Sequence, residues 1–184
     1  MKKTYLGILF FICMHALHAQ KTYVWYPSRI PEFELDSQSF KDLVIDVIIK
    51  DTRVIPPRSK VYCSPEELEK AVLELLTLNF PHSKVNKIEE SNSANSSARV
   101  IVTITLKSYF AKFSSPLWYG QTGFEVKVTN RFLESNQTES KEIEWITREN
   151  NWWGYKSARK ALQYAFDLAA EDLVNFISQT AGKY

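Results

Sequence analysis

Hydrophobic residues recur along the chain with two different periods, one typical of strands and the other of helices. In residues 42–54, apolar side chains occupy every second position from Leu43 to Ile49, so we expect a strand with one wholly apolar face. The same alternation returns in residues 99–109, 123–135 and 141–147 and predicts three further strands. The short polar segment 135–140 before the last of these is typical of an antiparallel turn.

Two other segments repeat their apolar residues at helical spacing. The first follows Ser64, which can cap a helix, and Glu67 three residues later completes a capping box. Its apolar stripe runs from Leu68 to Leu76 and predicts a face packed into the core. The second and longer helix is expected from Ser157 to Ile177.

The elements follow in the order strand, helix, a short strand within residues 83–90, three antiparallel strands and a final helix. This order predicts an α+β fold, a two-layer sandwich of one mostly antiparallel sheet with two helices packed on one face. The polar run 91–98 predicts a surface loop, and residues 111–122 an irregular aromatic link between strands. The other face of the sheet is left either to solvent or to the aromatic segment that precedes the first strand.

The chain divides into a signal peptide at 1–19, an extended aromatic arm at 20–41, a single domain at 42–178 and a tail at 179–184. Lys2 and Lys3 precede a short apolar run, and Ala19 is a suitable residue for cleavage before Gln20. A protein exported in this way is expected in the periplasm or outside the cell. A retained anchor helix and lipidation at Cys13 stay open as alternatives.

Composition after cleavage limits the chemistry that the domain can perform. Removal of Lys2 and Lys3 lowers the 23 basic residues to 21, equal to the 21 acidic ones, so no nucleic-acid partner is expected. Cys63 and His82 are then the only cysteine and histidine, which excludes an internal disulfide and the common zinc sites. We therefore predict no metal and no cofactor, and a buried rather than reactive Cys63.

No common catalytic motif occurs in the sequence. A nucleophile elbow, a phosphate loop, HExxH and CxxC are all missing, and His82 follows a proline in an expected loop. The acidic pairs at 66–67 and 89–90 are interpreted as a helix start and a solvated turn, although a glycan hydrolase that uses paired carboxylates stays open. We therefore predict that the protein is not an enzyme.

The remaining signal is aromatic, and six residues are candidates for a binding surface. Flat rings offer a large contact area to a sugar, a peptide or a lipid, but they can equally close the ends of the core. At the corner before Gly154 we expect one tryptophan to be mainly buried and its neighbour partly exposed. The candidates are Trp25, Trp118, Tyr119, Trp152, Trp153 and Tyr155.

The order of elements also resembles a known family. The strand LVIDVIIKDTR, the capped helix, the strand ARVIVTITLKSY and the final ALQYAFDLAAEDLVNFI look like YajG-type envelope lipoproteins and, more distantly, auxiliary lipoproteins of ABC transport systems and activators of penicillin-binding proteins. The chain departs from them at Pro56 and Pro57, where a glycine is expected, and in its lack of a lipidation motif. The resemblance implies a non-enzymatic envelope protein that binds a protein partner or an envelope component. A carbohydrate- or lipid-binding module, with association at the membrane surface or cell wall, is the alternative.

Overall fold

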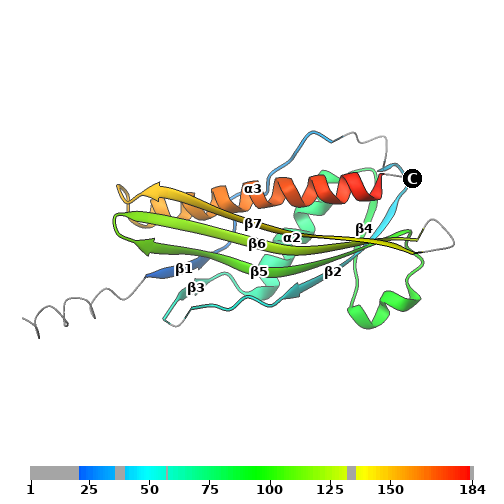
Figure 1. Ribbon diagram of the computed structural model, residues 1–184, viewed down its shortest axis with the longest axis horizontal. Coiled ribbons are helices and arrows are strands. Elements are labelled where there is room, and N and C mark those ends of the chain that lie inside the picture. The colour runs from blue at the N-terminus through cyan, green and yellow to red at the C-terminus, as the bar shows by residue number, and fades with distance from the viewer. Residues whose placement is uncertain (1–20, 36–39, 57, 132–135, 183–184) are drawn as a thin grey trace, which may run out of the picture.

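The structure is a computed structural model that describes residues 21–35, 40–56, 58–131 and 136–182 (Figure 1). The predicted signal peptide and its cleavage site lie outside these residues. Within the described ranges, no helix is long and apolar enough to cross a membrane.

In the part of the chain that the structure describes, seven strands form one curled sheet. They are β1 (Thr22–Trp25), β2 (Val44–Asp51), β3 (Lys60–Tyr62), β4 (Lys84–Lys87), β5 (Val100–Ser114), β6 (Leu117–Asn130) and β7 (Gln137–Asn150). The strands expected in residues 42–54 and 83–90 are confirmed within three residues at each end. Those expected in residues 99–109, 123–135 and 141–147 are confirmed with different bounds: β5 ends later, β6 begins earlier and β7 extends at both ends, while residues 132–135 lie outside the described residues. β1 and β3 had no expected counterpart. A short 3-10 helix, η2 (Glu90–Asn95), occupies the expected polar loop.

The α+β class is confirmed, but the expectation of a mostly antiparallel sheet is wrong. β2 pairs in parallel with both β4 and β5, and β1 in parallel with β3, while the β1–β5, β5–β6 and β6–β7 pairs are antiparallel. The helix between β2 and β4 carries the chain back to the end where β2 began, so that the next strand runs in the same direction. Alternation within a strand does not encode that direction, and the two-layer sandwich stays a prediction.

The long strand β5 holds the sheet together. It pairs with β6 along its whole length, with β2 along its first half and with β1 near its end. A bulge at Lys107 shifts the register between Leu106 and Ser108, so the inward positions change from even to odd residue numbers. Beyond the bulge, β5 and β6 stay paired through residues 111–122, where an irregular link was expected. A tight turn at Ser115–Pro116, whose peptide bond is cis, joins them.

Both predicted helices are present. α2 (Pro65–Asn79) begins with a complete capping box, in which the Glu67 N–H donates to Ser64 Oγ at 3.2 Å and the Ser64 N–H to Glu67 Oε2 at 2.7 Å. α3 (Tyr155–Ala181) extends beyond the predicted helix at both ends. Its apolar side lies along β5, β6 and β7.

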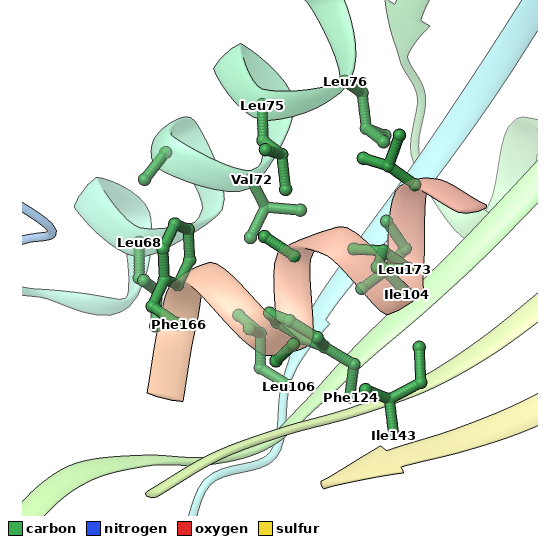
Figure 2. Packing of buried hydrophobic residues seen from close by; sticks show 14 of the residues in the cluster. Leu68, Val72, Leu75, Leu76, Ile104, Leu106, Phe124, Ile143, Phe166 and Leu173 are labelled. Carbon is green, nitrogen blue, oxygen red and sulfur yellow. The ribbon is translucent and has the colours of Figure 1, made fainter. Parts of the chain in front are cut away.

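One core lies between the helices and a single face of the sheet (Figure 2). Leucines of α2 meet Phe166 and Leu173 of α3 over Leu106 of β5 and Phe124 of β6. Each fully buried side chain of this size stabilises the fold by about 1.5–3 kcal/mol. The predicted burial of Cys63 is confirmed, since its side chain is 1% exposed.

Residues 28–33, which follow β1, lie on the helices. The N–H and hydroxyl of Ser28 donate to Gln163 Oε1 of α3 at 2.7 and 2.8 Å. The Phe33 N–H donates to Asn79 Oδ1 of α2 at 2.7 Å, and Asn79 Nδ2 donates to the Pro31 carbonyl at 3.0 Å. Within the predicted arm, residues 22–25 thus form a strand of the sheet and residues 28–33 bridge α3 and α2 on the helical side, while the opposite sheet face presents polar residues such as the exposed Lys127.

Candidate functional site

Aromatic side chains gather at one end of the molecule. There the β5–β6 turn, the end of β7 and the start of α3 meet the short strands β1 and β3, at the left of the view (Figure 1). We call this end the aromatic tip; it comprises Tyr23, Trp25, Tyr62, Trp118, Trp152, Trp153 and Tyr155.

The inner layer of the tip is a continuous stack of rings. Trp25 lies between two tyrosines, parallel to Tyr23 at 4.9 Å and to Tyr62 at 6.1 Å between ring centroids. Tyr23 and Trp25 share one face of β1 because they are two residues apart in a strand, and Tyr62 is the register partner of Trp25 in β3. The Arg159 guanidinium of α3 lies 5.6 Å from the Trp25 ring centroid, a cation–π contact that fixes this layer against the helix.

Trp118 is the member of the tip that closes the end of the sheet–helix core. Its side chain is 3% exposed and contacts Tyr23 at 5.6 Å and Phe113 at 5.1 Å between centroids. Its indole Nε1–H donates to Asn151 Oδ1 at 2.8 Å, which satisfies a buried donor. This bond also ties the loop after β7 to the core.

Both tryptophans of the adjacent pair face solvent. Trp152 is 80% exposed and Trp153 77%, so the expectation that one of them would be mainly buried is wrong. The physical reason is that Trp118 already fills the position at the end of the core that a ring of the pair was expected to occupy. The expected corner between the last strand and the last helix is confirmed, with Gly154 at a φ of +55° that favours glycine.

The backbone that carries the exposed pair is well held. The Trp152 N–H donates to the Asn150 carbonyl at 2.9 Å, and the Trp153 N–H to Ser157 Oγ at 3.3 Å. The Trp153 carbonyl in turn accepts from the Lys156 N–H at 3.2 Å. A ring held out on an ordered corner loses little conformational freedom when it binds, so the arrangement favours contact with a partner.

Two open hollows flank Trp152. One, of about 390 Å³, is lined by Trp152 and Trp153 together with Glu149, Asn150, Lys156, Ser157 and Lys160. The other, of about 310 Å³, lies toward Phe113, the Ser115–Pro116 turn, Asn150 and Asn151. The Trp152 ring therefore stands as a ridge between two shallow depressions, a shape that presents it to a surface.

Charge at the tip is strongly one-sided. Residues 21–25, 60–62, 111–121 and 146–160 contain seven basic residues and one acidic residue, Glu149, whose carboxylate lies 3.0 Å from Lys160 Nζ. The hydrogen bond from Tyr23 lowers the pKa of Tyr155, and the positive charges of nearby Lys60 and Lys21 lower it further. Burial and the same hydrogen bond raise the pKa of Tyr23 to about 12.

The structure brings together five of the six predicted candidates. Trp25 and Trp118 are buried in the inner layer, and Trp152, Trp153 and Tyr155 are exposed above it. Tyr119 instead lies on the other face of the sheet, where the Arg148 guanidinium is 5.6 Å from its ring centroid. The prediction missed the stacked Tyr23 and Tyr62, although the two-residue spacing of Tyr23 and Trp25 could have indicated the first.

Cys63 and His82, the residues whose types are common in catalytic and metal sites, lie in surroundings that serve the fold. Burial raises the pKa of the Cys63 thiol to about 11, and Arg53 opposes part of this shift. His82 is exposed on the turn after α2, where its carbonyl accepts from the Asp42 N–H at 3.0 Å. Among the described residues, no three histidine, cysteine, aspartate or glutamate side chains are grouped so that they could hold a metal ion.

Glutamates considered for a carboxylate pair also make structural contacts. Glu67 caps α2, and Glu90 forms an ion pair with Lys50 at 2.6 Å. These contacts agree with the interpretation of the first pair as a helix start and the second as a solvated turn.

Comparison with known proteins gives structural similarity without a family. No protein-family model and no curated protein matches the chain. The hypothetical protein CT253 from Chlamydia trachomatis is similar with a TM-score of 0.50 at 7% identity, over 76% of this chain and 98% of that one. This similarity shows the fold alone.

Two further solved structures are more distant. PelC from Paraburkholderia phytofirmans, a dodecamer, has a TM-score of 0.42 at 10% identity, over 85% of this chain and 94% of that one. Lipoprotein GNA1162 from Neisseria meningitidis has a TM-score of 0.40 at 10% identity, over 72% and 99%. The resemblance to YajG-type proteins stays a prediction.

Proposed function

We propose that the protein is an exported, non-catalytic accessory protein of the bacterial envelope that contacts an envelope component through its aromatic tip. The observation that carries this proposal is the high exposure of Trp152 and Trp153, 80% and 77%, on a hydrogen-bonded corner. Large apolar rings are costly to leave in water, and exposed apolar patches rimmed by polar residues mark interaction sites. The expected signal peptide places that contact outside the cytoplasm.

The remaining features of the domain support a scaffold role. The end of the core lies under the tip, and the stacked rings of Tyr23, Trp25 and Tyr62 adjoin its outer residues through the contact of Tyr23 with Tyr155, at 5.1 Å between ring centroids. The binding energy of a protein interface comes mostly from a few residues, among which tryptophan, tyrosine and arginine are the most frequent. A protein partner that binds at this surface is therefore the first candidate for the envelope component.

A carbohydrate is the second candidate ligand, favoured by one observation. The hollow of about 390 Å³ combines two indole rings with polar groups from Glu149, Lys156 and Ser157, and sugar recognition needs both a flat apolar face and hydrogen-bonding groups. Titration of intrinsic tryptophan fluorescence with envelope glycans tests this form. An unchanged emission spectrum with every glycan removes it.

Site-specific photocrosslinking in intact cells tests the main proposal. A photoreactive amino acid replaces Trp152 in one strain and Lys70, an exposed residue on α2, in a matched control strain. We expect a reproducible crosslinked species from position 152 and none of that size from position 70. Equal products from both positions, or a chain that stays free at both, would contradict the proposal.

A further inference from the structure

The charge and shape of the tip allow its occupant to be named more closely, on the basis of the proposed function. We infer that the aromatic tip docks on the surface of a membrane that contains anionic phospholipids, with Trp152 and Trp153 entering the interfacial region. Tryptophan is enriched at this depth of a bilayer because its ring is apolar while its N–H can still be solvated. The inference names a lipid surface in place of a folded protein or a soluble glycan.

Complementary charge is the first argument. Lys21, Lys60, Lys156 and Arg159 are exposed at this end, and Glu149, the acidic residue of these ranges, is already paired with Lys160. Arg148 is not counted with them because it lies with Tyr119 on the other face of the sheet. Basic side chains that surround apolar rings are the pattern by which peripheral proteins bind anionic leaflets. The chain as a whole has 23 basic and 21 acidic residues, so the excess of positive charge is a local property of this end.

Shape is the second argument. Trp152 and Trp153 lie on the corner between the end of β7 and the start of α3, and Trp152 stands between two open hollows while Trp153 lines one of them. A projecting pair of rings fits a surface that yields around it, as lipid headgroups do. A sugar or peptide is instead held in a concave site that covers most of its surface.

The path of the chain is the third argument. Lys21, which directly follows the residues assigned to export and cleavage, lies in the tip, where its carbonyl accepts from the Phe113 N–H at 2.9 Å. α3 begins at the tip and runs away from it for 27 residues. A docked molecule would thus stand on its tip, with the far ends of both helices directed away from the bilayer.

Vesicle binding by the exported chain, purified from cells, tests the inference. Phosphatidylcholine vesicles with and without phosphatidylglycerol are floated with the native chain, with Trp152→Ala/Trp153→Ala and with Lys60→Glu/Lys156→Glu. We expect binding to the anionic vesicles alone, with a partition coefficient about tenfold or more lower for either tip variant. Added salt should weaken binding by the native chain because it screens the basic side chains.

A charge-matched control separates the tip from net charge. Lys70→Glu/Lys127→Glu reverses the same number of exposed lysines on α2 and on the open sheet face, and its binding should stay within about twofold of the native chain. Because every variant has the same N-terminus, any contribution from residues before Lys21 is equal in all of them. Equal losses in the control and the tip variants would overturn the inference.

Tryptophan emission shows whether the rings themselves enter the bilayer. With brominated phosphatidylglycerol we expect quenching that Trp145→Phe retains and Trp152→Phe/Trp153→Phe loses. No binding to anionic vesicles, together with a protein crosslinked at position 152 in cells, would overturn this inference and leave the proposed function intact. No binding and no crosslink would overturn both.

Discussion

The two halves of β5 make different contributions to the molecule. Before the bulge at Lys107, the strand is flanked by β2 and β6 and covered by the helices, and its inward residues are aliphatic and fully buried. After the bulge, its outer neighbour is the short strand β1, and its surroundings are aromatic. One strand thus joins a half that stabilises the fold to a half that displays a surface, and substitutions on the two sides should separate stability from binding.

The largest expected effect comes from the first half. Phe124, paired with Leu106, is 1% exposed beneath α3, so Phe124→Ala should lower the free energy of unfolding by about 3–5 kcal/mol through lost burial and a cavity. Phe113→Ala, in the second half and only partly buried, should cost about 1–2 kcal/mol. Denaturant unfolding measures both values, and similar losses would remove the distinction between the halves.

A second prediction concerns the point where α3 lies closest to the sheet. A Cβ at Gly120 would be 2.2 Å from the backbone carbon and oxygen of Ala161, so Gly120→Ala must move the helix and should cost about 2–3 kcal/mol. At Gly123 the nearest atom is Ser108 Oγ at 2.6 Å, a side-chain atom that can rotate. Gly123→Ala should therefore stay within about 1 kcal/mol of the native chain, and thermal unfolding of the pair compares them directly.

How far the sequence predicted the fold depends on how local each signal is. The capping box of Ser64 and Glu67 lies within four residues, and it was found correctly. The bulge at Lys107 reverses the alternation, so a single period could not extend the strand through Phe113. The parallel pairing of β2 with β5 depends on the path of the chain across the sheet, which no local pattern records.

The site was predictable in composition but less so in arrangement. The residues of the tip were recognised as candidates because aromatic side chains are frequent there, yet the partner of Trp118 is Asn151, which lies 33 residues away and shows no aromatic signal. That contact decides that Trp152 and Trp153 are left outside the core. The basic surroundings were also missed, because Lys21, Lys60 and Lys156 come together only in the folded chain.

A third prediction concerns the effect of pH on stability. Burial raises the pKa of Cys63 from 9.0 to about 11, so the folded protein favours the neutral thiol. The resulting stability is fully present below pH 9 and is lost as the pH rises toward 11, by up to about 2–3 kcal/mol. Cys63→Ala should lack this part of the decline in unfolding free energy, and equal slopes in the two proteins between these pH values would contradict it.

The smallest expected effect on stability belongs to the residues proposed to bind. Trp152 and Trp153 leave 80% and 77% of their surfaces in water, so replacing both by alanine should change the free energy of unfolding by less than about 0.5 kcal/mol. Denaturant unfolding of this double variant and of Phe113→Ala, whose native ring contacts the buried Trp118, compares the free energies of unfolding for outer and inner residues at this end. A loss as large as that of Phe113→Ala would show that the two rings stabilise the corner, and binding defects in the double variant could then no longer be assigned to a lost contact.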